Sequence, residues 1–454
     1  MEARASRKRT KVEAGDPRSI ERGIRQLLAN KVTGNLAGVW LLVAEHLRLG
    51  TWDLLCGWTG QPTERVEPRL AMQLVHEAAV CTAGIRADRT VHQRGGFELA
   101  NGLPFVATDV AVHELLAGCT VAHSKRLQVG LGKLRRASGH FQGKLLVIDP
   151  HRVRSHSKRR MRQRVEKRNH RPVKMAQTFW VLDADTHQPV CFTAATAARS
   201  VVEATPELME LAQQILEPPE NETLVVADAE HFSGELIEAM RQRTGMDLLV
   251  PIPSRPAYRK SYRQIPEERF TRRWAGFATA KVPYTMQRGG PCFQFVERMG
   301  ERSDDFHYQG FLSTTDRDEV EALTRDFPKR WHVEEFFNAY QSMGWKRGGT
   351  QNLNIRYAQM TAALLAQTVI HQLRVRLGEP FSEWAADHFA KDLFFRLDGD
   401  VRVSGDTIVV TYYDAPNVDR LTPHYQDLPR KLAQEGVCPE IPWLYNYKLD
   451  FRFR

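Results

Sequence analysis

Two short apolar runs that each end in an aspartate constrain the fold of this chain more than any other feature. Residues 144–149 are KLLVID and residues 223–228 are TLVVAD, so the runs close on Asp149 and Asp228. Runs of this length and content are typical of strands buried in a parallel sheet. In open α/β sheets, functional groups lie beyond the carboxyl ends of such strands. Both aspartates are therefore expected at one edge of one sheet.

The segments between and after these runs predict the order in which the sheet is built. Alternating segments around the turn-like ADTHQP predict a hairpin, and a helical pattern closed by two prolines predicts a helix. In chain order, the further elements are a hairpin over residues 177–183 and 190–194, a helix over 202–216, a helix near 233–244 and a strand over 247–253. This alternation predicts an α/β domain.

A third carboxylate lies on the segment 327–341, FPKRWHVEEFFNAYQ, for which a helix is predicted. Residues four and seven apart share a stripe on a helix, so Arg330, Glu334 and Gln341 are expected on one face. An Arg–Glu pair at this spacing is also common on solvated helices. The two aspartates upstream favour another interpretation, in which Glu334 joins them in a site of three acids.

The spacing around Glu334 resembles the Tyr-x2-Arg-x3-Glu-x6-Lys signature of a large group of DDE transposases from bacterial insertion sequences. Arg330 and Glu334 match that signature. Phe327 stands at the tyrosine position, and Gln341 replaces the lysine. The resemblance extends over residues 141–376, about half of the chain, and its three acidic blocks occur in the same order.

This resemblance implies a ribonuclease H-like catalytic core in which Asp149, Asp228 and Glu334 are the catalytic residues and the metal ligands. The implied cofactor is a pair of Mg²⁺ ions, for which Mn²⁺ can substitute, with Asp149 bridging both ions. Carboxylate oxygens suit such hard cations, and two ions roughly 3.5–4 Å apart can stabilise the attacking and leaving oxygens of a phosphodiester. Water would free a 3′-hydroxyl at the element's end, and that hydroxyl would then attack target DNA.

The resemblance also implies DNA contacts beside Glu334. Arg330 and Gln341 occupy positions of the signature, and Lys346 with Arg347 could supply the charge that Gln341 lacks. The implied partner is double-stranded DNA, comprising the terminal inverted repeats of a transposon and the target. A homodimer is expected when the two ends are paired.

A basic segment follows the first acid. The chain has 64 Lys and Arg against 54 Asp and Glu, and residues 151–174 contain eleven of the basic residues with Glu166 as the one acid. Such a run is often a solvated loop. Its place beside a predicted metal site favours contact with DNA phosphates instead. The residues expected to make these contacts are Lys158, Arg159, Arg160 and Arg162.

Four segments are expected along the chain. They are a basic flexible arm over residues 1–30, a helical DNA-binding domain over 31–137, the catalytic domain over 138–376 with a β-rich insertion at about 254–315, and a C-terminal accessory region over 377–454. In the first domain, one helix is expected over 34–55, and Thr108 is expected to cap another. In the accessory region, a hairpin is expected over 401–413.

Cysteine spacing and hydropathy bear on the cellular compartment. The six cysteines show no CxxC spacing, which indicates free thiols in a reducing compartment. The longest apolar helical stretch, near residues 360–373, is too short to cross a bilayer. The start of the chain has no signal-peptide architecture. We therefore expect a cytoplasmic, nucleoid-associated protein without membrane contact.

The expected function is DNA transposition by metal-dependent end cleavage and strand transfer. One alternative is a domesticated DNA-binding protein that has kept the fold without cleavage. Another is a ribonuclease H-like nuclease that cuts without joining. A strand-transfer assay separates all three.

Overall fold

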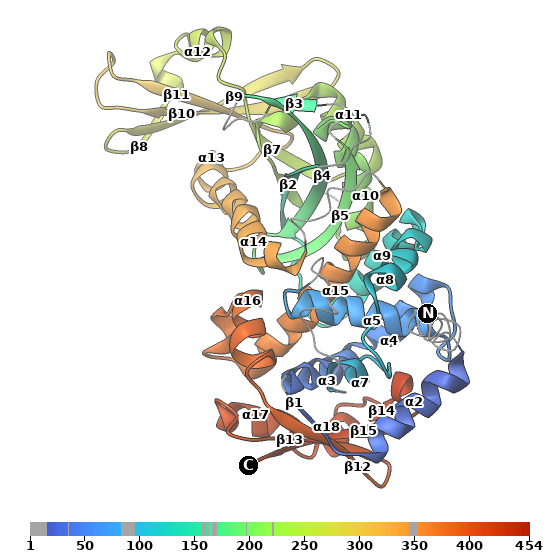
Figure 1. The fold of residues 1–454 in the computed structure, drawn as a ribbon. Coiled ribbons are helices and arrows are strands. Elements are labelled where there is room, and N and C mark those ends of the chain that lie inside the picture. The colour runs from blue at the N-terminus through green and yellow to red at the C-terminus, as the bar shows by residue number, and fades with distance from the viewer. Residues whose placement is uncertain are drawn as a thin grey trace. The chain divides into compact units, whose positions relative to one another are not determined.

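The computed structural model describes residues 16–34, 36–82, 96–155, 160, 163–165, 170–196, 198–219, 222–344 and 352–454. The contacts divide the chain into two compact units (Figure 1). The terminal unit contains residues 1–131 and 339–454, and the central unit contains residues 132–338. The division into four functional segments stays a prediction.

A ten-stranded sheet forms the centre of the central unit. Three parallel strands, β2 (Leu145–Arg154), β6 (Leu224–Val226) and β7 (Asp247–Pro251), lie side by side in it. The hairpin of β4 (Pro172–Asp183) and β5 (Gln188–Thr196) pairs with β2, and β3 (Gln163–Val165) pairs with β4. The two apolar runs and the hairpin are strands, as predicted, because strands buried on both faces require continuous apolar sequence. The first strand is longer than predicted, because β2 continues past Asp149 to Arg154.

Two helices between these strands confirm the predicted order. Helix α10 (Val201–Leu216) begins with a capping box, in which Ser200 and Glu203 bond each other's backbone N–H groups. It contacts β4, β5 and α11 (Gly234–Arg243) (Figure 1). The mixed α/β fold expected from the sequence is therefore present.

The β-rich insertion continues the same sheet. Strand β11 (His307–Ser313) pairs with β7, and the antiparallel strands β10 (Gly290–Met299), β9 (Phe277–Met286) and β8 (Thr271–Trp274) follow in order. Helix α12 (Pro256–Tyr262) belongs to this insertion, and α13 (Glu319–Glu321) follows β11. The insertion thus extends the ten-stranded sheet outward from β7.

The segment expected as one helix over residues 327–341 has three parts. A 3-10 turn over Phe327–Trp331, with Pro328 in its first turn, leads into α14 (His332–Tyr340). Tyr340 has a φ of −116° and a ψ of 0°, which ends the helix, and a second 3-10 turn covers Gln341–Met343. The expectation of a single helix was therefore wrong at both ends.

Helices and a second sheet make up the terminal unit. The five strands are β1 (Val32–Gly34), β12 (Gly399–Ser404), β13 (Thr407–Tyr412), β15 (Tyr447–Phe453) and β14 (Glu440–Ile441), in that spatial order. The helices are α2 (Pro17–Ala29), α3 (Trp40–Leu49), α4 (Thr51–Thr59), α5 (Val66–Ala79), α7 (Gly96–Ala100), α8 (Asp109–Gly118), α15 (Leu353–Leu377), α16 (Ala386–Phe389), α17 (Val418–Tyr425) and α18 (Leu428–Gln434). Helix α9 (Val121–Ala137) runs across the boundary between the units.

Several local predictions can be compared with this unit. Thr108 caps α8 through the N–H of Ala111, and β12 and β13 form the predicted hairpin. The single helix expected over 34–55 was wrong, because Gly50 has a φ of 61° and separates α3 from α4.

Part of the expected flexible arm is a helix. In α2, Asp16 provides the N-cap, and Ile20, Ile24 and Leu28 are buried at four-residue spacing. This apolar stripe gives the segment a face to bury, which accounts for its order. Among the described helices, none combines the length and the hydropathy needed to span a lipid bilayer.

Candidate active site

Asp149 and Asp228 lie at equivalent positions just past the paired residues of two neighbouring parallel strands, Asp149 within β2 and Asp228 after the end of β6. Val147 of β2 is opposite Val226 of β6, and each aspartate follows two residues later. On the other side of β2, Asp149 is opposite Trp180 of β4. Strand pairing therefore brings the two predicted acids to the same end of the β2–β6 ladder. The expectation that Asp149 ends its strand was wrong, because β2 continues beside β4 to Arg154.

The Asp149 carboxyl group is half-buried among charges. Burial raises its pKa to about 7, and the charges of Asp228 and Glu334 add to this increase while Arg330 and Arg152 oppose it. Within the described part of the chain, the carboxyl group accepts no hydrogen bond and joins no ion pair. Asp228 and Glu334 are thus both within electrostatic reach of Asp149.

Asp228 is held in a defined orientation. Its Oδ1 accepts a hydrogen bond from the backbone N–H of Glu230 at 3.0 Å and lies 2.8 Å from Nδ1 of the buried His231. Burial acts to raise the pKa of Asp228, but the hydrogen bond and charge of His231 and the Glu230 N–H outweigh it, so the pKa is lowered. The ionised form is therefore favoured at this position.

Glu230, two residues after Asp228, forms ion pairs with two arginines. Glu230 accepts hydrogen bonds from Arg152 of β2 at 2.5 Å and 3.3 Å, and from Arg164 of β3 at 2.9 Å. Sequence reasoning missed the roles of Glu230 and His231. The signal was their position directly after the second acid.

Glu334 comes to the site from α14. Its Oε1 lies 3.6 Å from Nη1 of Arg330, and Glu334 is 43% exposed while Arg330 is 15% exposed. On the other face of α14, Phe336 packs against Trp180 with ring centroids 5.4 Å apart. This packing fixes the helix over the strand that faces Asp149.

The remaining predicted site residues have different outcomes. Phe327 packs against Phe311 at 4.8 Å between ring centroids, a contact that needs no hydroxyl group. Gln341 lies beyond the end of α14 and belongs to the terminal unit, so it does not continue the predicted helix stripe. Of that stripe, the contact between Arg330 and Glu334 is present. Arg160 is exposed. Outside the described residues are Lys158, Arg159, Arg162, Lys346 and Arg347.

The donor set of the three acids fits a divalent cation. All the donors are carboxylate oxygens, which hard cations prefer. Asp228 and Glu334 both raise the pKa of Asp149, which shows that their negative charges repel its own. The oxygens of this triad do not all lie within 4.8 Å of one another. Among the described residues, one group with that closer spacing is His187, His332 and Glu335.

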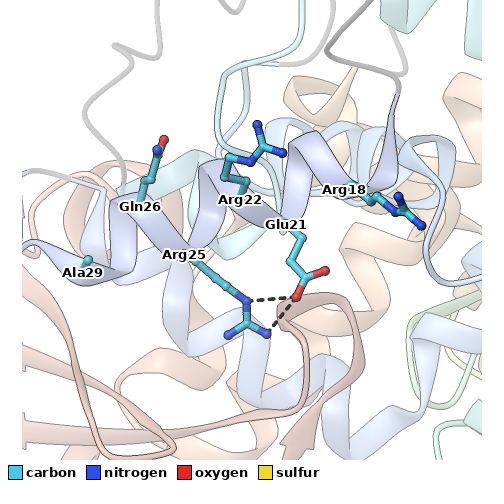
Figure 2. A pocket seen from close by; sticks show the side chains of 6 residues that line it. All are labelled: Arg18, Glu21, Arg22, Arg25, Gln26 and Ala29. Atoms are coloured by element: carbon cyan, nitrogen blue, oxygen red, sulfur yellow. Dashed lines mark hydrogen bonds and ion pairs between the residues drawn. The ribbon is translucent and has the colours of Figure 1, made fainter.

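A shallow hollow lies elsewhere, against α2 of the terminal unit. Figure 2 shows Arg25 and Glu21 directed toward each other, with an ion-pair distance of 2.8 Å. The full lining is Arg18, Glu21, Arg22, Arg25, Gln26 and Ala29. No carboxylate of the triad contributes to this hollow, so we do not associate it with the candidate active site.

Fold and site together define an α/β protein with one acid within a parallel strand, one just after its neighbour and one on a later helix. Residues 140–369 match the family described as "Transposase DDE domain". Because this match covers half of the chain, the chain belongs to that family. The coarse expectation of a DDE transposase is thereby confirmed.

The chain was also compared with curated proteins and with solved structures. No curated protein matches the chain. Among solved structures, the chain is similar to one described as "Cryo-EM structure of piggyBac transposase synaptic complex with hairpin DNA (SNHP)". The sequence identity is 11%, the similarity covers 81% of this chain and 82% of that chain, and the TM-score is 0.40.

Proposed function

We propose that this chain is a DNA transposase that cleaves transposon ends and joins the freed 3′-hydroxyl to target DNA. Asp149, Asp228 and Glu334 are its catalytic residues, carried on a ribonuclease H-like core. The observation that carries this proposal is the equivalent placement of Asp149 and Asp228 past the end of the β2–β6 ladder, with Glu334 close enough to affect the pKa of Asp149. Membership of the transposase DDE domain family supports it.

The three carboxylates would hold the cation. Mg²⁺ or Mn²⁺, when bound, would supply Lewis acidity to the reacting phosphate and its leaving oxygen. Asp228 is kept ionised by His231 and the Glu230 N–H and is therefore a ready ligand. Asp149 has no hydrogen-bond partner in the described chain, so its oxygens are available for the same role.

The basic groups would contribute to DNA binding. Arg330 lies 3.6 Å from Glu334 and would orient that side chain while offering its guanidinium group to a phosphate. The basic segment after Asp149 would bind the DNA backbone, which gives affinity without base specificity. The DNA partners are the transposon ends and the target, and a homodimer would hold the paired ends.

A strand-transfer assay tests this function. DNA from both flanks of the coding region would be supplied with a labelled 3′-end and a target plasmid, in Mg²⁺, with Glu334→Gln as the matched control. Labelled end joined to plasmid is expected for the wild-type chain and not for the variant. Cleavage without joining would favour the nuclease, and binding without cleavage would favour the domesticated DNA-binding protein.

A further inference from the structure

A second group of metal-binding side chains lies where the β4–β5 turn approaches the start of α14. His187, His332 and Glu335 each offer one ligand atom, and these atoms lie within 4.8 Å of one another. The imidazole rings of His187 and His332 have centroids 3.8 Å apart. Two imidazoles and one carboxylate can supply three ligands of a tetrahedral transition-metal site, with water as the fourth.

The backbone holds His187 in place. Oδ1 of Asp183 accepts hydrogen bonds from the N–H groups of Asp185 (3.1 Å) and Thr186 (3.0 Å), which tightens the turn. Its Oδ2 accepts hydrogen bonds from the N–H groups of Gln142 and Gly143, which fixes the turn to the rest of the central unit. His187 itself has a φ of 57°. The first ligand is therefore positioned by contacts that do not depend on an ion.

The second ligand is oriented in the way that metal-binding histidines usually are. Nδ1 of His332 lies 3.0 Å from the carbonyl oxygen of Ala184, and because a carbonyl can only accept, Nδ1 is the donor. Nε2 of the neutral ring is then left with its lone pair. A backbone carbonyl bound to the other ring nitrogen is the typical support of a metal-ligating histidine.

The third ligand is open to solvent. Glu335 is exposed and has no hydrogen bond or ion pair within the described part of the chain. Lys329 is already paired with Asp185 at 2.5 Å. An ion could therefore enter from solvent without displacing an existing contact of these ligands.

This group is separate from the catalytic acids. Successive residues on a helix point about 100° apart, so Glu335 and Glu334 lie on different faces of α14. Glu335 is three residues after His332, which places both on one helix face. Glu334 instead shares its face with Arg330.

We propose that His187, His332 and Glu335 form a second metal site, which takes a transition-metal cation of the Zn²⁺ class. Imidazole ligands favour such cations over Mg²⁺, which prefers oxygen donors. An ion bound here joins the β4–β5 turn to the helix that carries Glu334. It adds to the Lys329–Asp185 ion pair and the His332–Ala184 hydrogen bond, which already join the same two segments.

The test is a Co²⁺ titration of the full, untagged chain, monitored by visible absorption, followed by competition with Zn²⁺. Four-coordinate Co²⁺ with imidazole ligands absorbs strongly, whereas an all-carboxylate, six-coordinate site absorbs weakly, so the readout separates this site from the triad. We expect one saturable equivalent that Zn²⁺ displaces. His187→Ala and Glu335→Gln should each weaken binding by about tenfold or more. His307→Ala, at an exposed histidine of β11, is the matched control and should bind as the wild type does.

The possible outcomes decide the proposal. Absence of a saturable band, or equal titrations for the wild type and both ligand variants, would overturn it. Loss of the band in Asp149→Asn would assign the ion to the triad and would also overturn it. If circular dichroism shows that His187→Ala is unfolded, the Glu335→Gln titration decides whether the site exists. Glu335 is exposed and forms no hydrogen bond or ion pair within the described part of the chain, so this substitution leaves the fold intact. No outcome depends on DNA cleavage, so the proposed function is tested independently.

Discussion

Asp149 and Asp228 each lie two residues beyond Val147 and Val226, which form a matched pair of the parallel β2–β6 ladder. Parallel pairing in register makes this proximity a property of the sheet, because equal steps along two neighbouring strands end side by side. The cost is repulsion between like charges, which contributes to the raised pKa of Asp149. A bound cation would relieve that repulsion, and this links the fold to the proposed chemistry.

The first prediction concerns the triad. Separate substitutions Asp149→Asn, Asp228→Asn and Glu334→Gln should each lower Mg²⁺-dependent cleavage roughly 10³-fold, since metal coordination supplies several kcal/mol of transition-state stabilisation. End-DNA binding, measured by gel shift, should stay within a few-fold. Glu301→Gln, at an exposed acid before β11, is the matched control. Full cleavage by any triad variant would remove that residue from the site.

The second prediction concerns His231 as a positioning residue. Its hydrogen bond helps to lower the pKa of Asp228, so His231→Ala should raise that pKa. Asp228 would then remain protonated to a higher pH, and the acidic limb of the cleavage rate should move upward in pH. His231→Gln, which can still donate a hydrogen bond, should partly restore the profile. A uniform loss of rate at every pH would instead indicate a purely structural role.

The third prediction concerns metal choice. An all-carboxylate site should support cleavage with Mg²⁺ or Mn²⁺, and Ca²⁺ should block cleavage because its longer, looser coordination misplaces the reacting oxygens. Cleavage would be measured on end DNA with each cation and with EDTA. Robust cleavage in EDTA is incompatible with the proposed mechanism.

The central part of the fold could be predicted because its determinants are local. The apolar runs before Asp149 and Asp228 are continuous in sequence, and a parallel sheet places their ends together without further information. The Arg330–Glu334 contact likewise follows from the four-residue spacing.

Other features depend on contacts that sequence periodicity does not carry. Strand β1 pairs with β12, with Val32 opposite Val401, so strands from the two ends of the chain share one sheet. The C-terminal tail pairs in parallel with β13 as β15. His231 and the His187–His332 contact are set by turns whose backbone conformations have no periodic signal.

The fourth prediction concerns the dependence of stability on pH. Burial raises the pKa of Glu77 to about 7 although Gln73 donates a hydrogen bond to it at 2.6 Å. Between the ordinary value of 4.5 and about 7, the unfolded chain releases this proton first, so stability should fall as pH rises. The loss of folding stability is on the order of 3 kcal/mol and is complete once the pH is above the folded-state pKa of Glu77.

Glu77→Gln tests this dependence because the amide keeps an oxygen that can accept the Gln73 hydrogen bond. Urea unfolding at about pH 5 and about pH 8 should show a smaller loss of stability for the variant than for the wild type. The exposed Glu64→Gln is the control and should leave the difference unchanged. Identical pH dependence in wild type and Glu77→Gln would show that Glu77 ionises normally in the folded chain.

The last prediction concerns the basic segment after Asp149, for which the two interpretations, solvated loop and DNA contact, give different responses to salt. Each phosphate that a Lys or Arg neutralises releases condensed counterions, so each contact contributes roughly 0.9 to the slope of log affinity against log salt. Neutralising Lys158, Arg159, Arg160 and Arg162 together should flatten that slope by about 2 to 4, and the loss of affinity should be similar for end DNA and random DNA. Affinity for both duplexes would be measured across a salt series in Ca²⁺, so that binding is observed without cleavage. An unchanged slope would identify the segment as solvated surface, whereas a loss confined to end DNA would mean that these side chains recognise sequence or shape, because phosphate contacts carry no base information.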